Sequence, residues 1–594
     1  MSRARRALLP ALVFAVAFLT FWPGLSGEFV NWDDDVNFLA NPNYRGLGWN
    51  NLRWMATTTY QGHWIPLSWL TLGVNYALDG MKPRGYHLGN LLLHGANATL
   101  FYWTARRLLT AAGAAAGELS LTAGAAFAAL LFAVHPLRVE SVVWITERRD
   151  VLSTLFFLAS ALGYLRAVEE GRNGRLAPRW RLLSILAFVC AFMSKASTIM
   201  LPAALLLIDV YPLRRLGVGW RRLIVEKLPY FGLAAADLAI SLFAVVREAR
   251  VTGLEEHGLT GRAAMVLYSF FFYPWKWVWP IKLSPMYEVP AHLNALAPRF
   301  LVPAAVVVLV SVMLVALRRR WPAGLAAWLY SALMILPLSG VVHVGYQLAQ
   351  DRWSYRSGMG FALVMGGGLA RLLDERARAR VSAVITRTVL AGAAGIVFVL
   401  AAGAWDQSKI WQDSETLWRW AATLDPQCKM CWNNLGTALT GQQRHAEAEE
   451  AYRRAYAIRP YAAVANNIAT ALFNQGKTAQ GEEMLREALH LDPDLTGALV
   501  NLGSQQARAG RFAEALPHLR RAYARDPVFP DAARVLTAAL IGQAALELRS
   551  GRAPLAATLY REALAVQPGN AEAREGLDGL ASTRVPATGS DLRR

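Results

Sequence analysis

The chain has 594 residues, of which 55% are hydrophobic and 17% are charged, and its mean hydropathy is +0.26. This composition excludes an ordinary soluble globular protein of this length and indicates a polytopic membrane protein. The formal net charge is +19, but no basic stretch of the sequence is interleaved with aromatic residues as in a nucleic-acid-binding module. We therefore expect arginine-rich loops between membrane spans, and no nucleic-acid partner.

Eleven apolar runs of spanning length occur in the first 404 residues. They lie at 7–25, 86–105, 119–136, 151–167, 182–197, 198–213, 229–246, 301–317, 322–340, 357–373 and 388–404. Arginine clusters precede the first run and follow the second, fourth, sixth, eighth and tenth. With eleven spans and a cytoplasmic N-terminus, all of these clusters lie on the cytoplasmic side of the membrane. The positive-inside rule requires this placement. The pattern predicts a membrane protein with an external loop at 27–88 and an external C-terminal region. Scarce lysine with abundant arginine, alanine and glycine indicates a bacterial source, so the expected membrane is the inner membrane and the external side is the periplasm.

The segment at 263–282 does not fit this count simply. It contains the aromatic run YSFFFYPWKWVWPIK, in which prolines and lysines interrupt the apolar residues. These interruptions favour an interfacial or re-entrant helix with tryptophan at the level of the lipid headgroups. A pair of short half-spans stays open as an alternative.

Beyond residue 404 the composition becomes that of a soluble domain, with internal similarity at about 34 residues. The recurring segments are WNNLGTALTGQ at 432–442, NNIATALFNQG at 466–476, NLGSQQARAG at 501–510 and AALELRSG at 544–551. Small residues, a tyrosine or leucine, and a helix-ending proline follow each segment, which is typical of tetratricopeptide (TPR) helix pairs. The interval before the fourth segment is longer by about seven residues, so we expect an irregular junction there.

The predicted fold is therefore all-α and has three parts. A polytopic membrane bundle occupies 1–404, a TPR solenoid occupies 405–582, and a disordered tail occupies 583–594. Such solenoids present a concave peptide-binding face, although an inert spacer is the alternative.

Three consecutive acids, Asp33, Asp34 and Asp35, open the external loop. Crowded carboxylates raise one another's pKa, which is costly. Their placement beside a membrane span therefore indicates that at least one of them has a function. Three alternatives stay open: a solvated charge cluster, a helix cap, or a divalent metal held by two of the acids.

The order of these parts resembles the transmembrane-and-TPR O-mannosyltransferases and their bacterial relatives. The segments that carry the resemblance are FVNWDDDVNFLANP at 29–42, GYHLGNLLLHGANA at 85–98, FAVHPLRVESVVWITERRDVLS at 132–153, MSKAST at 193–198 and VGYQLAQDRWSYRSGMGF at 344–361. The resemblance implies a C-type glycosyltransferase fold that uses a polyprenyl-phosphate sugar as donor. It also implies that an acid of the first external loop activates the acceptor hydroxyl, with no cofactor required.

By match to the acidic pair of that family's loop, Asp34 is the expected general base. Asp33 and Asp35 are not separated from it by spacing; in an extended segment both would point away from the side that Asp34 faces. The departing phosphate needs cations, and the expected ones are Lys195, Arg352, Arg148, Arg149 and Arg138. Internal ion pairs with Glu147, Asp150 or Asp351 are the alternative for the arginines, and snorkelling to the interface is the alternative for Lys195.

Further residues of the external segments are expected to line the sugar pocket. They are His63, His87, His135, Glu140, His343 and Tyr355. A lone histidine is also commonly a structural hydrogen-bonding group. Cys428 and Cys431 have the spacing of a local disulfide on an oxidising side of the membrane.

The sequence therefore predicts an inverting transferase that moves a hexose from a lipid phosphate to a protein hydroxyl, with the TPR domain recruiting the acceptor. Two alternatives stay open: a non-catalytic membrane-anchored TPR scaffold for envelope or secretion assembly, and a transferase acting on lipid-linked glycan.

Overall fold

A computed structural model describes residues 3–172, 174–247, 254–290, 293–341, 347–529 and 531–582. These residues are mostly helical, which confirms the predicted helical class. Among them, one small antiparallel sheet pairs β1 (Tyr287–Glu288) with β2 (Gln347–Ala349). The chain divides into two compact units, with the division after Leu424.

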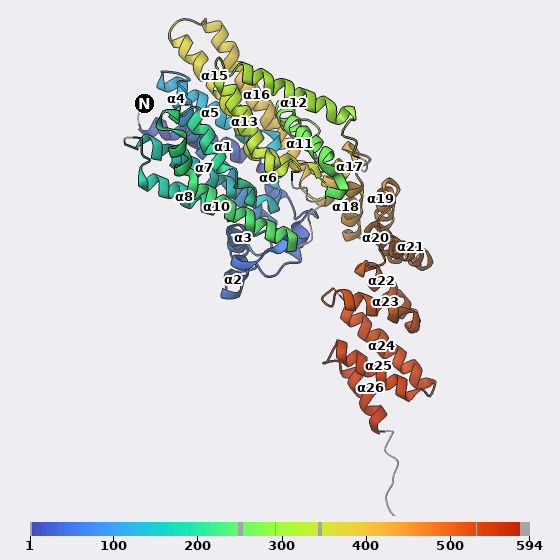
Figure 1. Ribbon diagram of the computed structural model, residues 1–594. Coiled ribbons are helices and arrows are strands. Elements are labelled where there is room, and N and C mark those ends of the chain that lie inside the picture. Colours follow the sequence, from blue (N-terminus) through green and yellow to red (C-terminus); the bar gives the residue numbers. More distant parts are fainter. Residues whose placement is uncertain are drawn as a thin grey trace, which may run out of the picture. The chain divides into compact units, whose positions relative to one another are not determined.

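The N-terminal unit is a bundle of helices (Figure 1). Its longer helices are α1 (Arg3–Thr20), α4 (Pro83–Ala111), α5 (Glu118–Ala133), α7 (Arg148–Glu169), α8 (Pro178–Phe192), α10 (Trp220–Arg247), α11 (Leu254–Val278), α12 (Pro298–Ala316), α13 (Pro322–Ile335), α15 (Met359–Ala377) and α16 (Ala383–Ile410). Its shorter helices are α2 (Trp49–Thr57), α3 (Pro66–Asp79), α6 (Val139–Val143), α9 (Leu201–Val210), α14 (Ser354–Ser357) and α17 (Ser414–Leu424).

Four helices in the described ranges are long and apolar enough to cross a membrane, namely Ile145–Glu169, Trp220–Arg247, Pro298–Ala316 and Ala383–Ile410. A bent pair, Glu118–Ala133 and Pro136–Val143, adds a fifth if it is counted as one span. The predicted count of eleven spans is therefore not confirmed. Several predicted spans form shorter helices; the runs at 182–197 and 198–213, for example, correspond to α8 with 15 residues and α9 with 10 residues.

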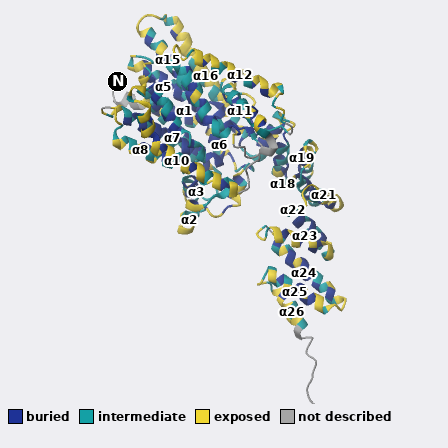
Figure 2. Ribbon diagram, in the orientation of Figure 1, coloured by how far each residue is buried: buried dark blue, intermediate teal, exposed yellow. Residues whose placement is uncertain are grey.

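Burial separates the helices of this unit into central and peripheral ones. In the apolar window of the span that contains α7, 67% of the window is buried, whereas in that of α16 only 6% is buried. Figure 2 shows the burial of each residue. Large apolar side chains of α10, α12 and α16, such as Phe243, Leu309 and Phe398, are exposed. An apolar helix face that no protein covers is suited to lipid, so this unit is a membrane body.

The expected domain boundary at 404 falls inside α16, which continues to Ile410. The next helix, α17, belongs to the N-terminal unit. In it, Trp418 donates a hydrogen bond from Nε1 to Asn31 Oδ1 (2.7 Å), and Ser414 Oγ accepts one from the Asn31 backbone N–H (2.9 Å).

The C-terminal unit is a run of antiparallel helix pairs. They are α18 (Lys429–Gly441) with α19 (His445–Ile458), α20 (Ala462–Asn474) with α21 (Thr478–Leu491), α22 (Thr496–Arg508) with α23 (Phe512–Arg525) and α24 (Ala532–Arg549) with α25 (Ala553–Val566), followed by α26 (Ala571–Ser582). The irregular junction predicted before the fourth pair is present: α24 has 18 residues, whereas α18, α20 and α22 have 13 each. Cys428 and Cys431 form a disulfide at the start of α18.

Glycines allow the two helices of a pair to approach closely. A Cβ added to Gly436 would lie 2.6 Å from the ring of Tyr452, and one added to Gly503 would lie 2.5 Å from Leu519 Cγ. This explains why the repeat combines a small residue in the first helix with an aromatic or leucine in the second.

We expect Gly503→Ala to destabilise the third pair by about 1–3 kcal/mol, because the new methyl group overlaps the buried Leu519 side chain. Gly497→Ala in the same helix is the control, because its nearest side-chain atom is 3.6 Å away. Hydrogen exchange of α22 and α23 amides in the full-length protein measures the difference. Equal exchange in the two variants would contradict this account of the packing.

Candidate functional site

The acidic triplet lies in a turn and not in an extended strand. Asp33 has a positive φ of 141°, Asp34 has helical dihedral angles, and Asp35 begins a short π-helical turn that ends at Leu39. A positive φ is strained for a residue with a side chain, and such strain is often found at functional sites. The turn places the three carboxylates in three different environments.

Asp34 is fully buried, and both of its carboxylate oxygens accept hydrogen bonds. Oδ1 accepts from the backbone N–H of Thr146 (3.2 Å) and from its hydroxyl (2.6 Å), and Oδ2 accepts from the Val30 N–H (3.1 Å). Burial raises the pKa of Asp34 to about 7, although the hydrogen bonds from Thr146 and Val30 oppose this effect. Asp34 therefore ties the acidic loop to the segment that precedes α7.

Asp33 is an exposed residue, and its carboxylate lies close to the charges of the bundle. Desolvation raises the pKa of Asp33 to about 6, while the guanidinium groups of Arg149 and Arg352 act in the opposite direction. A carboxylate with such a pKa can exchange a proton with a bound molecule near neutral pH. Asp35 is half-buried, and desolvation raises its pKa as well.

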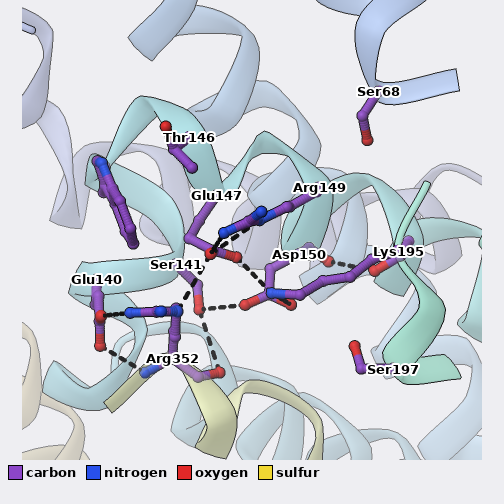
Figure 3. Close-up of polar contacts among 12 residues, drawn as sticks. Ser68, Glu140, Ser141, Thr146, Glu147, Arg149, Asp150, Lys195, Ser197 and Arg352 are labelled. Carbon is purple, nitrogen blue, oxygen red and sulfur yellow. Dashed lines mark hydrogen bonds and ion pairs between the residues drawn. The ribbon is translucent and has the colours of Figure 1, made fainter. Parts of the chain in front are cut away.

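Glu147 is the centre of a buried ion cluster that comes from three separate parts of the chain (Figure 3). Its Oε1 accepts from Arg149 Nη2 at 2.9 Å and lies 3.2 Å from Arg352 Nε. Its Oε2 accepts from Lys195 Nζ at 2.6 Å. One carboxylate therefore holds three of the cations that were expected to bind phosphate.

Asp150 extends this cluster on the α7 side. Lys195 Nζ lies 2.9 Å from its Oδ1, and Ser141 Oγ donates to its Oδ2 at 3.3 Å. Arg356 Nη1 lies 3.9 Å from Asp150 Oδ1 and donates to Ser153 at 3.1 Å. Lys195 is thus ion-paired twice and is not a residue that merely snorkels.

Arg352 closes the cluster on the other side. Its side chain pairs with Glu140 Oε1, and its backbone N–H donates to Glu140 Oε2 at 2.8 Å. Its guanidinium also lies 4.9 Å from the centroid of the Trp144 ring. These contacts fix both its position and its charge. The pairing that was expected as an alternative, with Asp351, is thus replaced by pairing with Glu140 and Glu147.

Tryptophans line the site beside the cations. The Trp32 ring, next to Asp33, lies 6.2 Å from the Trp144 ring and 5.1 Å from the Trp418 ring, and Trp144 lies 5.8 Å from Trp411. Aromatic faces of this kind provide an apolar surface next to the polar cluster.

Other expected residues lie away from the cluster. The Arg148 guanidinium donates to Asn90 Oδ1 and to the carbonyl of Tyr86 on α4, and His87 Nε2 lies 3.1 Å from the Gly27 carbonyl. The buried Arg138 donates to the carbonyl of Ser354 at 2.8 Å. Each of these groups joins one segment of the bundle to another.

His135 and Tyr355 are likewise engaged inside the bundle. His135 Nε2 lies 2.9 Å from the Trp277 carbonyl, and the Tyr355 hydroxyl lies 2.7 Å from His94 Nδ1. His63 instead lies near the cluster, because it lines a small cavity of about 20 Å³ together with Thr146 and Arg149. His343 is outside the described residues.

Several residues of the site carry no individual signal in the sequence. Thr146, Ser141 and Ser197 are ordinary hydroxyl residues, and Arg356 lies four positions after the expected Arg352. The acids Glu147 and Asp150 were expected only as ion-pair partners of the arginines beside them. In the described ranges, no group of three or more His, Cys, Asp or Glu side chains is arranged to hold a metal ion.

Comparison with known protein families identifies repeats toward the C-terminus of the chain. Residues 398–463 and 466–528 match a family model described as tetratricopeptide repeat. The repeats predicted from the sequence period are therefore confirmed.

The chain is also similar to named relatives. It is 26% identical over 508 residues to protein O-mannosyl-transferase TMTC1 of Homo sapiens, covering 77% of this chain and 55% of the relative. It is 34% identical over 201 residues to protein O-mannosyl-transferase TMTC4 of Homo sapiens, covering 31% of this chain and 27% of the relative. The predicted resemblance to the O-mannosyltransferase-like TPR family is confirmed. The chain spans about half the length of the first relative and about a quarter of the second.

Solved structures of TPR proteins also align with part of the chain. One of them is YrrB, described as a TPR protein with an unusual peptide-binding site. The two chains are 18% identical, the alignment covers 28% of this chain and 81% of YrrB, and the TM-score is 0.23. This TM-score is too low to compare the whole folds of the two proteins.

We expect Glu147→Gln to destabilise the N-terminal unit by about 3–5 kcal/mol, because three partly buried cations lose their shared, fully buried carboxylate. Glu169→Gln is the control: it removes a partly exposed pair with Arg107, for which we expect about 0–1 kcal/mol. Thermal unfolding in detergent compares the two variants. A Glu147→Gln protein as stable as the control would contradict the central place of this carboxylate.

Proposed function

We propose that the chain is a membrane glycosyltransferase that transfers a hexose, with mannose as the first candidate, from a polyprenyl-phosphate donor to a hydroxyl group of a protein. The observation that carries the proposal is the Asp33 carboxylate, which belongs to an exposed residue and interacts electrostatically with Arg149 and Arg352. The names of the relatives, protein O-mannosyl-transferases, support the same class of reaction.

The reaction needs two groups that this arrangement supplies. The acceptor oxygen attacks the anomeric carbon of the sugar and loses its proton to a carboxylate, which acts as general base. The bond from the anomeric carbon to the phosphate oxygen breaks, and its electron pair stays on the phosphate. Nearby cations stabilise the charge that develops there. Attack on the face opposite the phosphate inverts the configuration of the sugar.

Asp33 is better placed as the base than Asp34, the residue expected from the family match. A base must reach the acceptor hydroxyl, and Asp34 is fully buried with both oxygens already hydrogen-bonded. Asp33 is exposed at the surface of the same turn. In this assignment Asp34 is a positioning residue, because its bonds to Thr146 fix the turn on which Asp33 lies.

The donor phosphate is assigned to Arg149, Arg352 and Lys195. Their side chains remain 11%, 10% and 16% exposed, respectively, so each reaches the surface of the cluster. An arginine has five N–H donors, and pairing with Glu147 or Glu140 leaves some of them for a phosphate oxygen. The carboxylates hold these cations in place before the donor binds.

The positions of the arginine clusters support an orientation with the N-terminus in the cytoplasm. The acidic loop and the TPR unit then lie on the external side, which is the periplasm of a bacterium. We assign the recruitment of the protein acceptor to the TPR unit, since such repeats bind peptides.

A second candidate function is a membrane-anchored scaffold without catalysis. It is favoured by one observation, namely that Lys195, Arg149 and Arg352 are all already paired with carboxylates. In that case the cluster only stabilises the bundle, and the acid at position 33 has no chemical task.

Substitution of the proposed base distinguishes the two functions. We expect Asp33→Asn to lower sugar transfer by about 10²- to 10⁴-fold, because an amide accepts no proton at neutral pH. Asp35→Asn, two residues further on, is the matched control and keeps its activity. Transfer of labelled mannose from synthetic polyprenyl-phosphate mannose to membrane proteins measures both. Full activity of Asp33→Asn would leave the scaffold as the remaining function.

The reaction is also expected to depend on pH. Because the pKa of Asp33 is raised to about 6, its carboxylate is present above that pH and becomes protonated below it. We therefore expect kcat/KM to fall as the pH drops through about 6, and this limb to disappear in Asp33→Asn. A profile that stays flat down to about pH 4 would assign the base to another residue.

A further inference from the structure

A large cavity lies inside the N-terminal unit, separate from the ion cluster. Its volume is about 1010 Å³, and its walls come from α4, α7, α9, α13 and α15. This volume lies at the upper end of the range that is usual for sites that bind organic ligands.

The walls of the cavity are apolar over most of their length. They include Phe101 and Leu108 of α4, Phe157 of α7, Ile208 of α9 and Leu363 of α15. A cavity lined in this way does not hold ordered water well, because water needs polar partners. Its natural occupant inside a membrane is a hydrocarbon chain.

The cavity runs along α15 and has two different ends. It extends from Met359 to Glu375, which corresponds to about 24 Å at the helical rise of 1.5 Å per residue. Met359 lies within one helical turn of Arg356, at the side of the ion cluster. The other end lies at the last turn of α15 and the start of α13.

This second end is exposed and basic. Arg320, Arg371 and Arg378 line it, and the exposed Trp321 lies beside them. Arg378 is paired with Asp374 at 2.9 Å. Within the described part of the chain, the side chains of Arg320 and Arg371 make no hydrogen bond or ion pair, so they retain their full capacity for an anion.

The two carboxylates at this end do not cancel that charge. Besides pairing with Arg378, Asp374 accepts hydrogen bonds from the backbone N–H groups of Ala116 (3.1 Å) and Gly117 (2.9 Å). Glu375 lies 3.4 Å from Arg380. The cations left for a ligand are therefore Arg320 and Arg371.

We propose that this cavity binds an anionic phospholipid, with its acyl chains between the five helices and its phosphate at Arg320 and Arg371. The chemistry of the two parts matches: hydrocarbon fits the apolar walls, and a phosphate fits the guanidinium groups that line the basic end beside a tryptophan. Basic pockets between membrane helices on the cytoplasmic side are suited to such headgroups.

This lipid is distinct from the sugar donor. The inference rests on the membrane placement of the proposed function, in which the donor phosphate lies at Arg149 and Arg352, at the opposite end of the bundle. Arg371 lies toward the C-terminal end of α15, whereas Arg356 and the ion cluster lie before the N-terminal end of this helix. The bound phospholipid instead holds α13 and α15 against α4 and α9, and so supports the segment that carries Arg356.

Lipid binding to the purified full-length protein tests the inference. After delipidation in detergent, native mass spectrometry measures the binding of phosphatidylglycerol and of phosphatidylcholine with the same acyl chains. We expect wild type to bind the anionic lipid at least tenfold more tightly. Arg320→Ala with Arg371→Ala abolishes this preference, whereas Arg318→Ala with Arg319→Ala, a neighbouring pair that does not line the cavity, keeps it.

A second variant tests the cavity itself. A Cβ added to Gly368, which lines the cavity, has no atom within 4 Å, so Gly368→Phe fills space without a clash at that atom. We expect it to lose bound phospholipid by at least tenfold, while the delipidated protein keeps the thermal stability of delipidated wild type. Equal binding of the two lipids to wild type overturns the inference, as does binding of polyprenyl phosphate in place of phospholipid. Neither result depends on sugar transfer, so the proposed function is tested separately.

Discussion

The buried carboxylate of Glu147 is the interaction on which the candidate site depends. It accepts contacts from Arg149, Arg352 and Lys195, which come from α7, the segment before α14 and the segment before α9. An isolated charge in this environment would be very costly, and a shared partner reduces that cost for all three cations. Because these groups come from three separate parts of the sequence, their pairing also determines how these segments meet.

The acidic turn depends on the same region through Asp34. Its hydrogen bonds to Thr146 attach the loop one residue before Glu147, so the exposed Asp33 is positioned relative to the cations by neighbouring backbone. This arrangement separates two tasks that adjacent acids might have shared. One carboxylate holds the turn, and the other remains accessible.

The sequence allowed the helical class, the TPR period and the family resemblance to be predicted, because each rests on a pattern that repeats or extends over many residues. It did not allow the span count to be predicted, because an apolar run such as 198–213 does not reveal how short its helix is: α9 has only 10 residues. Nor did it distinguish the adjacent Arg148 and Arg149. One turns toward Asn90 on α4 and the other toward Glu147, and this depends on contacts across the bundle.

The contact of α17 with the acidic loop has a practical consequence for dissecting the protein. Trp418 and Ser414 both bond to Asn31, only two residues before Asp33. Removing the chain from residue 412 onward would therefore take away the support of the reactive turn together with the repeats. Loss of activity in such a truncation would not show that acceptor capture had failed. A cut after Leu424, which spares this support, separates the two effects.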